Sequence, residues 1–235
     1  MQGEIKHFSA AETLCRAVAE DFINLARQCI TLHGEFNIAL SGGNTPEQLY
    51  KLLADEYGDA VSWDKLRFYF GDERHVPVTH VDSNFNMVDN ALLKHLRISE
   101  NAIYPIQTKH EPDIAASLYA QTLIDNLPDH NGLPKFDLVF LGMGMDGHTA
   151  SLFSLDSLQD KKIVIATYVE KFKSWRISLN YNVLNNADSI WVLITGADKH
   201  TMFSQLQSGN ANDMPISAIT PQGRLSWYVD HDVCP

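Results

Sequence analysis

Apolar residues recur at intervals of three and four near the start of the chain. The positions that fall on one face of a helix are Leu14, Val18, Phe22, Leu25, Cys29 and Leu32. This spacing predicts one long amphipathic helix after a short strand at 4–8. Ser9 and Glu12 have the spacing of a capping box at its start.

Short apolar runs then alternate with segments that favour helices. The runs predict strands at 36–40, 66–70, 136–141, 162–169, 176–180, 189–195 and 225–230. The helices are expected from Pro46, over 83–96 with Ser83 as cap, over 113–127 and from Asp198. Fully apolar strands alternating with helices indicate an α/β fold, with a mostly parallel twisted sheet flanked by helices on both faces, as in Rossmann-like proteins. No repeat or linker divides the chain, so a single domain over 1–235 is expected.

Three of the expected strands end in polar loops that contain glycine. SGGNTP follows 36–40, GDERHVP follows 66–70, and GMGMDGHTAS follows 136–141. Ligands of open α/β sheets bind at the carboxyl ends of the strands. The three loops therefore predict the position of a site at that edge.

The first loop has the form of a helix start. Thr45 is placed as a cap and Pro46 as the first helical residue. The helix amides would point back at Gly42, Gly43 and Asn44, where two glycines allow a ligand to approach the backbone. A phosphate site fits this arrangement, and so does a capped turn without a ligand.

The second loop is rich in charge. Asp72, Glu73 and Arg74 come just after a buried strand, where they could orient a substrate or neutralise an anion. A solvated loop with a local ion pair is the alternative. His75 and His80 have no further ligand at a regular spacing, so no metal site is expected.

The third loop places glycines in the spacing G-x-G-x-x-G, which alone suggests a dinucleotide fingerprint. Asp146 and His148 do not belong to that task, because a turn that cradles phosphate needs small side chains. Imidazole suits general-base catalysis near neutral pH, and Asp146 could fix its tautomer. The alternative is a helix start after His148, capped by Asp or Thr. Ser151 as a nucleophile is disfavoured because no G-x-S-x-G elbow is present.

Composition narrows the class of ligand. The net charge of −11 and the lack of a Lys/Arg cluster argue against nucleic acid, whereas a few local cations could still bind a small anion. No apolar run reaches the roughly 18 to 20 residues of a membrane helix, and the N-terminus is charged, so a cytoplasmic protein is expected. Cys15 and Cys29 lie about 21 Å apart on the expected helix and are interpreted as reduced core thiols.

Several blocks together resemble the 6-phosphogluconolactonase family. They are SGGNTP, GDERHVPVTHVDSNFNM, GMGMDGHTASLF, RISLNYNVLNNA, TGADKH and LSWYVD, in the family's order across nearly the whole chain. The resemblance implies a fold shared with glucosamine-6-phosphate deaminase. It also implies hydrolysis of 6-phospho-D-glucono-1,5-lactone to 6-phospho-D-gluconate in the oxidative pentose phosphate pathway, without a cofactor.

The resemblance also implies roles for individual residues. His148 matches the family's general base and Asp146 its partner. The positions that match its substrate and phosphate contacts are Gly42, Gly43, Asn44, Thr45, Asp72, Arg74, Arg176 and Lys199. Two departures stand out: Ser154 and Leu155 replace the usual Pro-Gly, and the prolines common before Arg176 are missing.

Two other functions remain open at this point. One is an amino-sugar-phosphate isomerase or deaminase. The deaminases resemble one another in having a glutamate soon after D-G-H, and HTASLFSL contains no such glutamate. Asp72 could supply the base instead. A sugar-phosphate sensor without turnover is disfavoured by the intact Asp146 and His148. The oligomeric state is not predicted.

Overall fold

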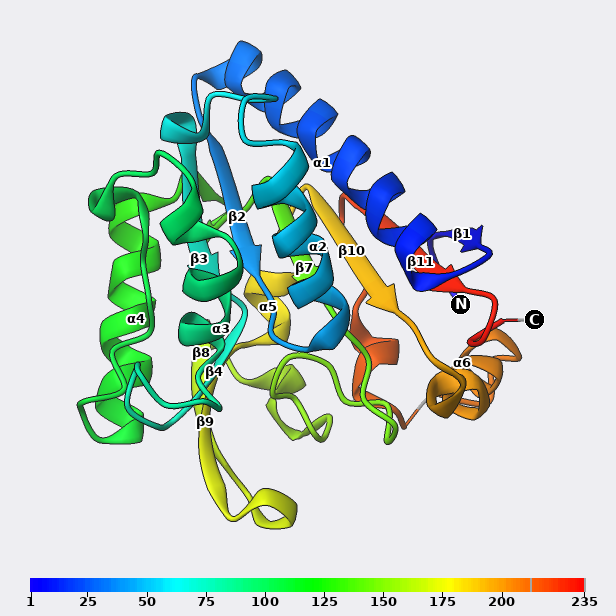
Figure 1. Cartoon of the computed structure of the whole chain (residues 1–235). Helices are drawn as coiled ribbons and strands as arrows, with labels where there is room; N and C mark the ends of the chain where they lie inside the picture. The colour runs from blue at the N-terminus through cyan, green and yellow to red at the C-terminus, as the bar shows by residue number, and fades with distance from the viewer. Residues whose placement is uncertain (212, 235) are drawn as a thin grey trace.

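A six-stranded parallel sheet forms the centre of the protein (Figure 1). The computed structural model describes residues 1–211 and 213–234. The strand order of the six-stranded sheet is β1-β11-β10-β7-β2-β3, and every neighbouring pair is parallel. The strands are β1 (Glu4–Phe8), β2 (Phe36–Leu40), β3 (Leu66–Phe70), β7 (Leu138–Leu141), β10 (Ser189–Ile194) and β11 (Arg224–Asp230). The α/β fold expected from the apolar runs is confirmed.

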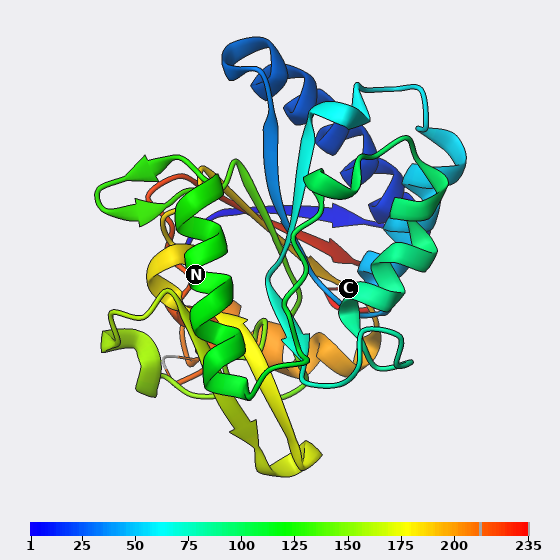
Figure 2. The same cartoon turned by 90° about the vertical axis from the view of Figure 1, so that its left-hand side faces the viewer.

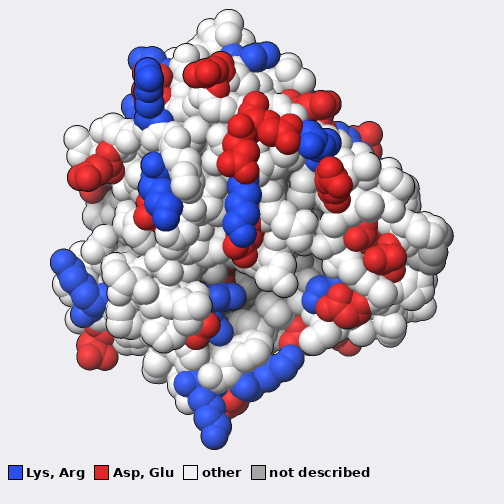
Figure 3. Space-filling view, in the orientation of Figure 1, with Lys and Arg blue, Asp and Glu red and all other residues white. Residues whose placement is uncertain are grey.

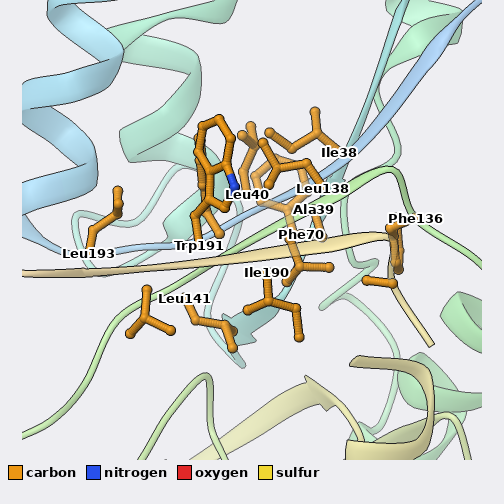
Figure 4. Close-up of a cluster of buried hydrophobic side chains, with 14 of the residues drawn as sticks. Ile38, Ala39, Leu40, Phe70, Phe136, Leu138, Leu141, Ile190, Trp191 and Leu193 are labelled. Atoms are coloured by element: carbon orange, nitrogen blue, oxygen red, sulfur yellow. The ribbon is translucent and has the colours of Figure 1, made fainter. Parts of the chain in front are cut away.

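The inner strands are almost entirely apolar because both of their faces are covered, and Asn37 of β2 and Ser189 of β10 are their buried polar residues. Every residue of β2, β7 and β10 is buried. Ile38 of β2 lies in register with Leu138 of β7, and Val139 of β7 with Ile190 of β10. Figure 4 shows side chains of these strands packed together. Each large apolar side chain buried here stabilises the fold by about 1.5–3 kcal/mol.

Helices cover both faces of this sheet. They are α1 (Ala11–His33), α2 (Asn44–Glu56), α3 (Asn84–Ala91), α4 (Pro112–Asn126), α5 (Tyr181–Leu184) and α6 (His200–Gln207). Figure 2 shows α1 and α2 on one side of the sheet, with α4 and α5 on the other. Short 3₁₀ helices lie at Trp63–Lys65, Leu93–His95, Glu100–Ala102, Asp156–Gln159, Glu170–Phe172, Ala197–Lys199 and Pro215–Ala218. None of the described helices is both long enough and apolar enough to cross a membrane.

The strands expected at 162–169 and 176–180 lie in a second sheet, apart from the parallel one. β8 (Val164–Val169), β9 (Ser174–Leu179) and β4 (Asp72–Arg74) form a separate antiparallel sheet. Only the short turn at Glu170–Phe172 joins β8 to β9, and a parallel pair would need a long crossover. This hairpin projects from the body of the molecule (Figure 1). A two-stranded ribbon, β5 (Asp129–His130) with β6 (Leu133–Pro134), completes the strands.

The start of α1 differs from the prediction. It begins at Ala11, and Ala10, not Ser9, is the cap residue. The hydroxyl of Thr13 accepts the N–H of Ala10 at 3.2 Å, so the predicted capping box is wrong. Leu32, expected on the apolar face, is 80% exposed because it lies in the last turn of α1.

The start of α2 differs as well, whereas that of α3 is confirmed. α2 begins at Asn44, with Gly43 as cap at a positive φ of 108°. The hydroxyl of Thr45 does not cap the helix but hydrogen-bonds that of Thr195 at 2.6 Å. Ser83 caps α3 as predicted, because its hydroxyl accepts the N–H of Asn86 at 3.1 Å.

Candidate active site

A cavity of about 370 Å³ opens at the carboxyl ends of the parallel strands. Its walls come from the loops after β2, β7 and β10, together with β4 and the start of α3. Figure 3 shows a hollow on this face with Lys and Arg side chains beside it. Its lining residues include Gly42, Gly43, Asn44, Thr45, Asp72, Arg74, Asn84, His148, Thr195, Asp198 and Lys199. The three loops selected from the sequence therefore meet at one site.

His148 and Asp146 form a hydrogen-bonded pair at the wall of this cavity. Nδ1 of His148 donates to Oδ1 of Asp146; His148 lines the cavity, whereas Asp146 is not one of its lining residues. Partial burial disfavours ionisation of Asp146, but the hydrogen bond and charge of His148 outweigh that effect and lower the pKa of Asp146 to about 2. The carboxylate is thus ionised near neutral pH. It can hold the imidazole in the tautomer that leaves Nε2 free to accept a proton.

The loop that holds this pair is a compact turn. Among the described residues no helix starts directly after His148, and the next one is the 3₁₀ turn at Asp156–Gln159. The capped-helix alternative and the dinucleotide fingerprint are therefore both wrong, since each needs a helix at this point. Gly147 turns the chain in a left-handed conformation (φ 77°) and donates to the carbonyl of Gly144 at 3.0 Å. The N–H of Gly144 donates in turn to the carbonyl of His148 at 2.8 Å. A Cβ atom at Gly144 would overlap the His148 ring, so glycine here makes room for the imidazole.

The tip of the β8–β9 hairpin contacts the same pair. Nζ of Lys171 lies 3.4 Å from Oδ2 of Asp146. Phe153 stacks on the His148 ring with 4.3 Å between the ring centroids, and Phe172 packs edge-on against Phe153 at 6.1 Å. Sequence reasoning missed all three residues. Only the stretch HTASLF places an aromatic residue near His148, and nothing local points to a hairpin tip more than twenty residues away.

The amino end of α2 forms another part of the cavity wall. Gly42, Gly43, Asn44 and Thr45 line the cavity there, as the sequence predicted for a phosphate loop. The first N–H groups of a helix have no partner within it, and the helix dipole favours an anion at this end. Lys199, from the turn after β10, also lines the cavity and pairs with Asp198 at 3.0 Å. Together they offer amide donors and one cation to an anionic group.

The acidic residues of the second loop are buried, which excludes the solvated-loop alternative for them. Oδ2 of Asp72 accepts the hydroxyl of Ser151 at 2.6 Å, and Oδ1 accepts Nδ2 of Asn84 at 3.2 Å. Glu73 accepts the backbone N–H groups of Asn84 and Phe85 at 2.6 and 2.8 Å, at the start of α3. Burial raises the pKa of Glu73. Asp72 therefore faces the cavity, whereas Glu73 anchors a helix.

Arg74 and Arg176 differ in their positions. Arg74 lines the cavity and donates to the carbonyl of Asp82 at 2.8 Å. Arg176, its partner across β4 and β9, is not part of the cavity wall but lies against the ring of Phe172, 5.4 Å from Cζ to the centroid. Its Nε and Nη1 are buried without a hydrogen-bond partner. Burial and the nearby Arg74 lower the pKa of Arg176. The expected direct contact of Arg176 with phosphate therefore gains no support from its position.

The sequence and the fold are similar to those of known proteins. Residues 9–227 match the family described as glucosamine-6-phosphate isomerases/6-phosphogluconolactonase. A 6-phosphogluconolactonase of Treponema pallidum is 36% identical over 217 residues, covering 91% of this chain and 90% of its own. The solved 6-phosphogluconolactonase from Trypanosoma brucei is 27% identical, with a TM-score of 0.88 over 99% of this chain and 97% of its own. A monomeric glucosamine-6-phosphate deaminase shares the fold alone, with 17% identity and a TM-score of 0.83 over 98% of both chains.

Proposed function

Because the chain belongs to the family of glucosamine-6-phosphate isomerases and 6-phosphogluconolactonases, we propose that it hydrolyses 6-phospho-D-glucono-1,5-lactone to 6-phospho-D-gluconate. This is the lactonase step of the oxidative pentose phosphate pathway. The observation that carries the proposal is the His148–Asp146 pair in one cavity with the amino end of α2 and Lys199. His148 supplies the base, and the amino end of α2 together with Lys199 supplies the anion site.

In the proposed mechanism neutral His148 removes a proton from water as the water oxygen attacks C1 of the lactone. Asp146 stabilises the imidazolium that forms. The tetrahedral intermediate then expels the ring oxygen, which takes the proton back from His148. The products are a C1 carboxylic acid, which ionises in water, and a free hydroxyl at C5. The base is restored after each turnover.

The phosphate provides binding and orientation at a distance from the reacting carbon. The α2 amides at Gly43–Thr45 and the Lys199 ammonium would hold it, and Arg74 would contact the substrate from β4. These local donors act within a few ångströms, so the net charge of −11 does not prevent anion binding. The proposed partner is thus a soluble sugar phosphate met in the cytoplasm, with no part for nucleic acid or membrane.

The deaminase alternative rests on Asp72, which lines the cavity. Both of its carboxylate oxygens already accept hydrogen bonds, from Ser151 and Asn84, which favours a positioning role over proton transfer. The residues from Thr149 to Leu155 contain no carboxylate. A lactone has an activated carbonyl and needs only a delivered water, so the His148–Asp146 pair is sufficient for it.

Two assays on one purified sample test the proposal. The first follows the initial rate of acid release from freshly generated 6-phosphogluconolactone against the spontaneous rate in the same buffer. The second follows ammonia release from glucosamine 6-phosphate. We expect accelerated lactone opening that is lost in His148→Asn, and no ammonia. Ammonia release without accelerated lactone opening would contradict the proposal and favour Asp72 as the base.

A further inference from the structure

Three side chains with different metal-binding atoms meet at the end of α1. Cys29 and His33 lie one helical turn apart, and Asp137 comes just before β7. Nε2 of His33 is 3.1 Å from Oδ1 of Asp137, and one potential ligand atom from each of the three residues lies within 4.8 Å of the others. Among the described residues, no other group of three or more His, Cys, Asp or Glu was found with this arrangement.

This cluster lies at the opposite edge of the sheet from the proposed active site. Asp137 precedes β7, whereas Gly142 follows it and lines the cavity. The four residues of β7 separate the two edges by roughly 13 Å at about 3.3 Å per residue. Figure 1 shows the end of α1 where β2 begins, away from the carboxyl ends of the strands. The cluster is therefore independent of the proposed catalysis.

We propose that Cys29, His33 and Asp137 form a binding site for Zn²⁺ or a similar transition-metal ion. A thiolate sulfur, an imidazole nitrogen and a carboxylate oxygen are the donors that Zn²⁺ uses in proteins. Mg²⁺ and Ca²⁺ prefer oxygen ligands alone, so the sulfur and nitrogen disfavour them. Sites with three protein ligands hold zinc with water or another molecule as the fourth ligand. The His33 side chain is 45% exposed, which gives an ion a route from solvent.

The surrounding structure orients the carboxylate of this cluster. Oδ2 of Asp137 accepts the backbone N–H of Asn37 at 2.7 Å, which turns Oδ1 toward His33. Such outer hydrogen bonds position metal ligands and raise affinity. Cys29 and Asp137 are each only 8% exposed. Two of the three donors are thus held in place before an ion arrives.

One more carboxylate acts on this cluster from outside it. The carboxylate of Asp188 acts electrostatically on both Cys29 and Asp137. The ion pair of Asp188 is with Lys135, at 2.6 Å.

Metal binding would release the thiol proton of Cys29 to the buffer and would join the end of α1 to the start of β7. Because the three residues meet only in the folded chain, a bound ion would stabilise that chain against unfolding.

The alternative is a His33–Asp137 ion pair with Cys29 packed beneath it and no affinity for metal. The sequence offers one hint of the site, the i, i+4 spacing of Cys29 and His33 on a helix. The third donor is more than a hundred residues away, so the spacing alone did not identify it. The fold is needed to bring Asp137 to the pair.

Titration with Co²⁺ tests the site in the full-length protein after treatment with a chelator and its removal. We expect the near-ultraviolet absorption of a cobalt–thiolate bond to saturate at one equivalent and to disappear on addition of Zn²⁺. Cys29→Ser should abolish the band. Cys234→Ser is the matched control, because Cys234 is a partly exposed thiol elsewhere, and it should keep the band.

A second variant keeps the test decisive if Cys29→Ser fails to fold. His33→Asn changes a side chain that is 45% exposed and should weaken Zn²⁺ binding in calorimetry by at least about tenfold. Absence of the cobalt band in the wild type, its persistence in Cys29→Ser, or unchanged Zn²⁺ affinity in His33→Asn would overturn the proposal. Lactonase turnover should be the same with chelator and with Zn²⁺, so failure of the proposed function would leave these binding results intact.

Discussion

The ammonium of Lys171 lies 3.4 Å from the carboxylate oxygen of Asp146 that does not hold His148. One carboxylate is thus shared between the proposed general base and a lysine at the tip of the β8–β9 hairpin. The proton affinity of the imidazole depends on the net charge beside it, which Asp146 makes more negative and Lys171 less so. Substitutions of these two residues should shift the pH–rate profile in opposite directions.

Asp146→Asn should lower kcat by at least about tenfold and move the acid limb of kcat/KM to lower pH. The enzyme is active when His148 is neutral, and the carboxylate stabilises the imidazolium, so its removal lets the imidazole stay neutral in more acid solution. The pKa of Asp146, lowered to about 2, means that Asp146 itself does not titrate in the working range. A pH–rate profile from pH 4 to 9 measures the shift. An acid limb unchanged in Asp146→Asn would show that the pair does not set it.

Lys171→Met should move the same limb to higher pH at low ionic strength. Loss of the ammonium leaves the Asp146 charge less balanced and so favours the imidazolium. The Lys171 side chain is 58% exposed, so salt should screen the effect and nearly abolish the shift at high ionic strength. Lys173→Met removes the same charge two residues away and is the control. Equal shifts in both variants would show a general charge effect instead of the ion pair.

His148→Ala should lower kcat by roughly 10²- to 10⁴-fold with a smaller change in KM, because a lost general base affects the transition state more than binding. Stopped-time assays corrected for spontaneous lactone opening give both constants. Circular dichroism would check that the variant is folded. A folded variant with nearly full turnover would exclude His148 as the base.

The sequence predicted the parallel sheet because burial on both faces leaves a signal within each strand. Apart from Asn37 in β2 and Ser189 in β10 these two strands are apolar runs, and such a run can be recognised without knowledge of its neighbours. The second sheet left no comparable signal. Asp72 of β4 pairs with Ser178 of β9 more than a hundred residues later, and only the folded chain determines that pairing.

The candidate site also combines residues that the local sequence predicts with residues that only the folded chain brings together. Asp146 and His148 lie in one short loop, and their chemistry could be inferred from that loop. The residues that orient the carboxylates of the site come from distant segments: Lys171 contacts Asp146 from a hairpin tip, and Ser151 donates to Asp72 from the loop after β7. Local patterns therefore predicted the reactive groups and missed the groups that position them.

Lys199→Ala should raise KM at least about tenfold and change kcat little, because a contact remote from the reacting carbon exists in both the ground and transition states. Lys51→Ala is the control, since Lys51 on α2 is exposed, pairs with Glu47 and carries the same charge outside the cavity. Unphosphorylated gluconolactone should be a poor substrate of the wild type and should be insensitive to Lys199→Ala. Equal use of both lactones by the wild type would mean that no phosphate pocket exists.

Gly144→Ala tests why glycine stands in the catalytic loop. Its added Cβ would overlap the His148 ring, which is held between Asp146 and the face of Phe153 and must move to relieve the overlap. Movement of the ring breaks the alignment of the proposed base, so kcat should fall about tenfold or more while phosphate binding, read from KM, changes little. Gly71→Ala is the matched control. A Cβ at Gly71 meets the carbonyl of Leu40 at an ordinary 3.5 Å, near the cavity but outside its wall, and this variant should keep kcat within about twofold. If both variants retained kcat, the close approach of Gly144 to His148 would have no part in catalysis.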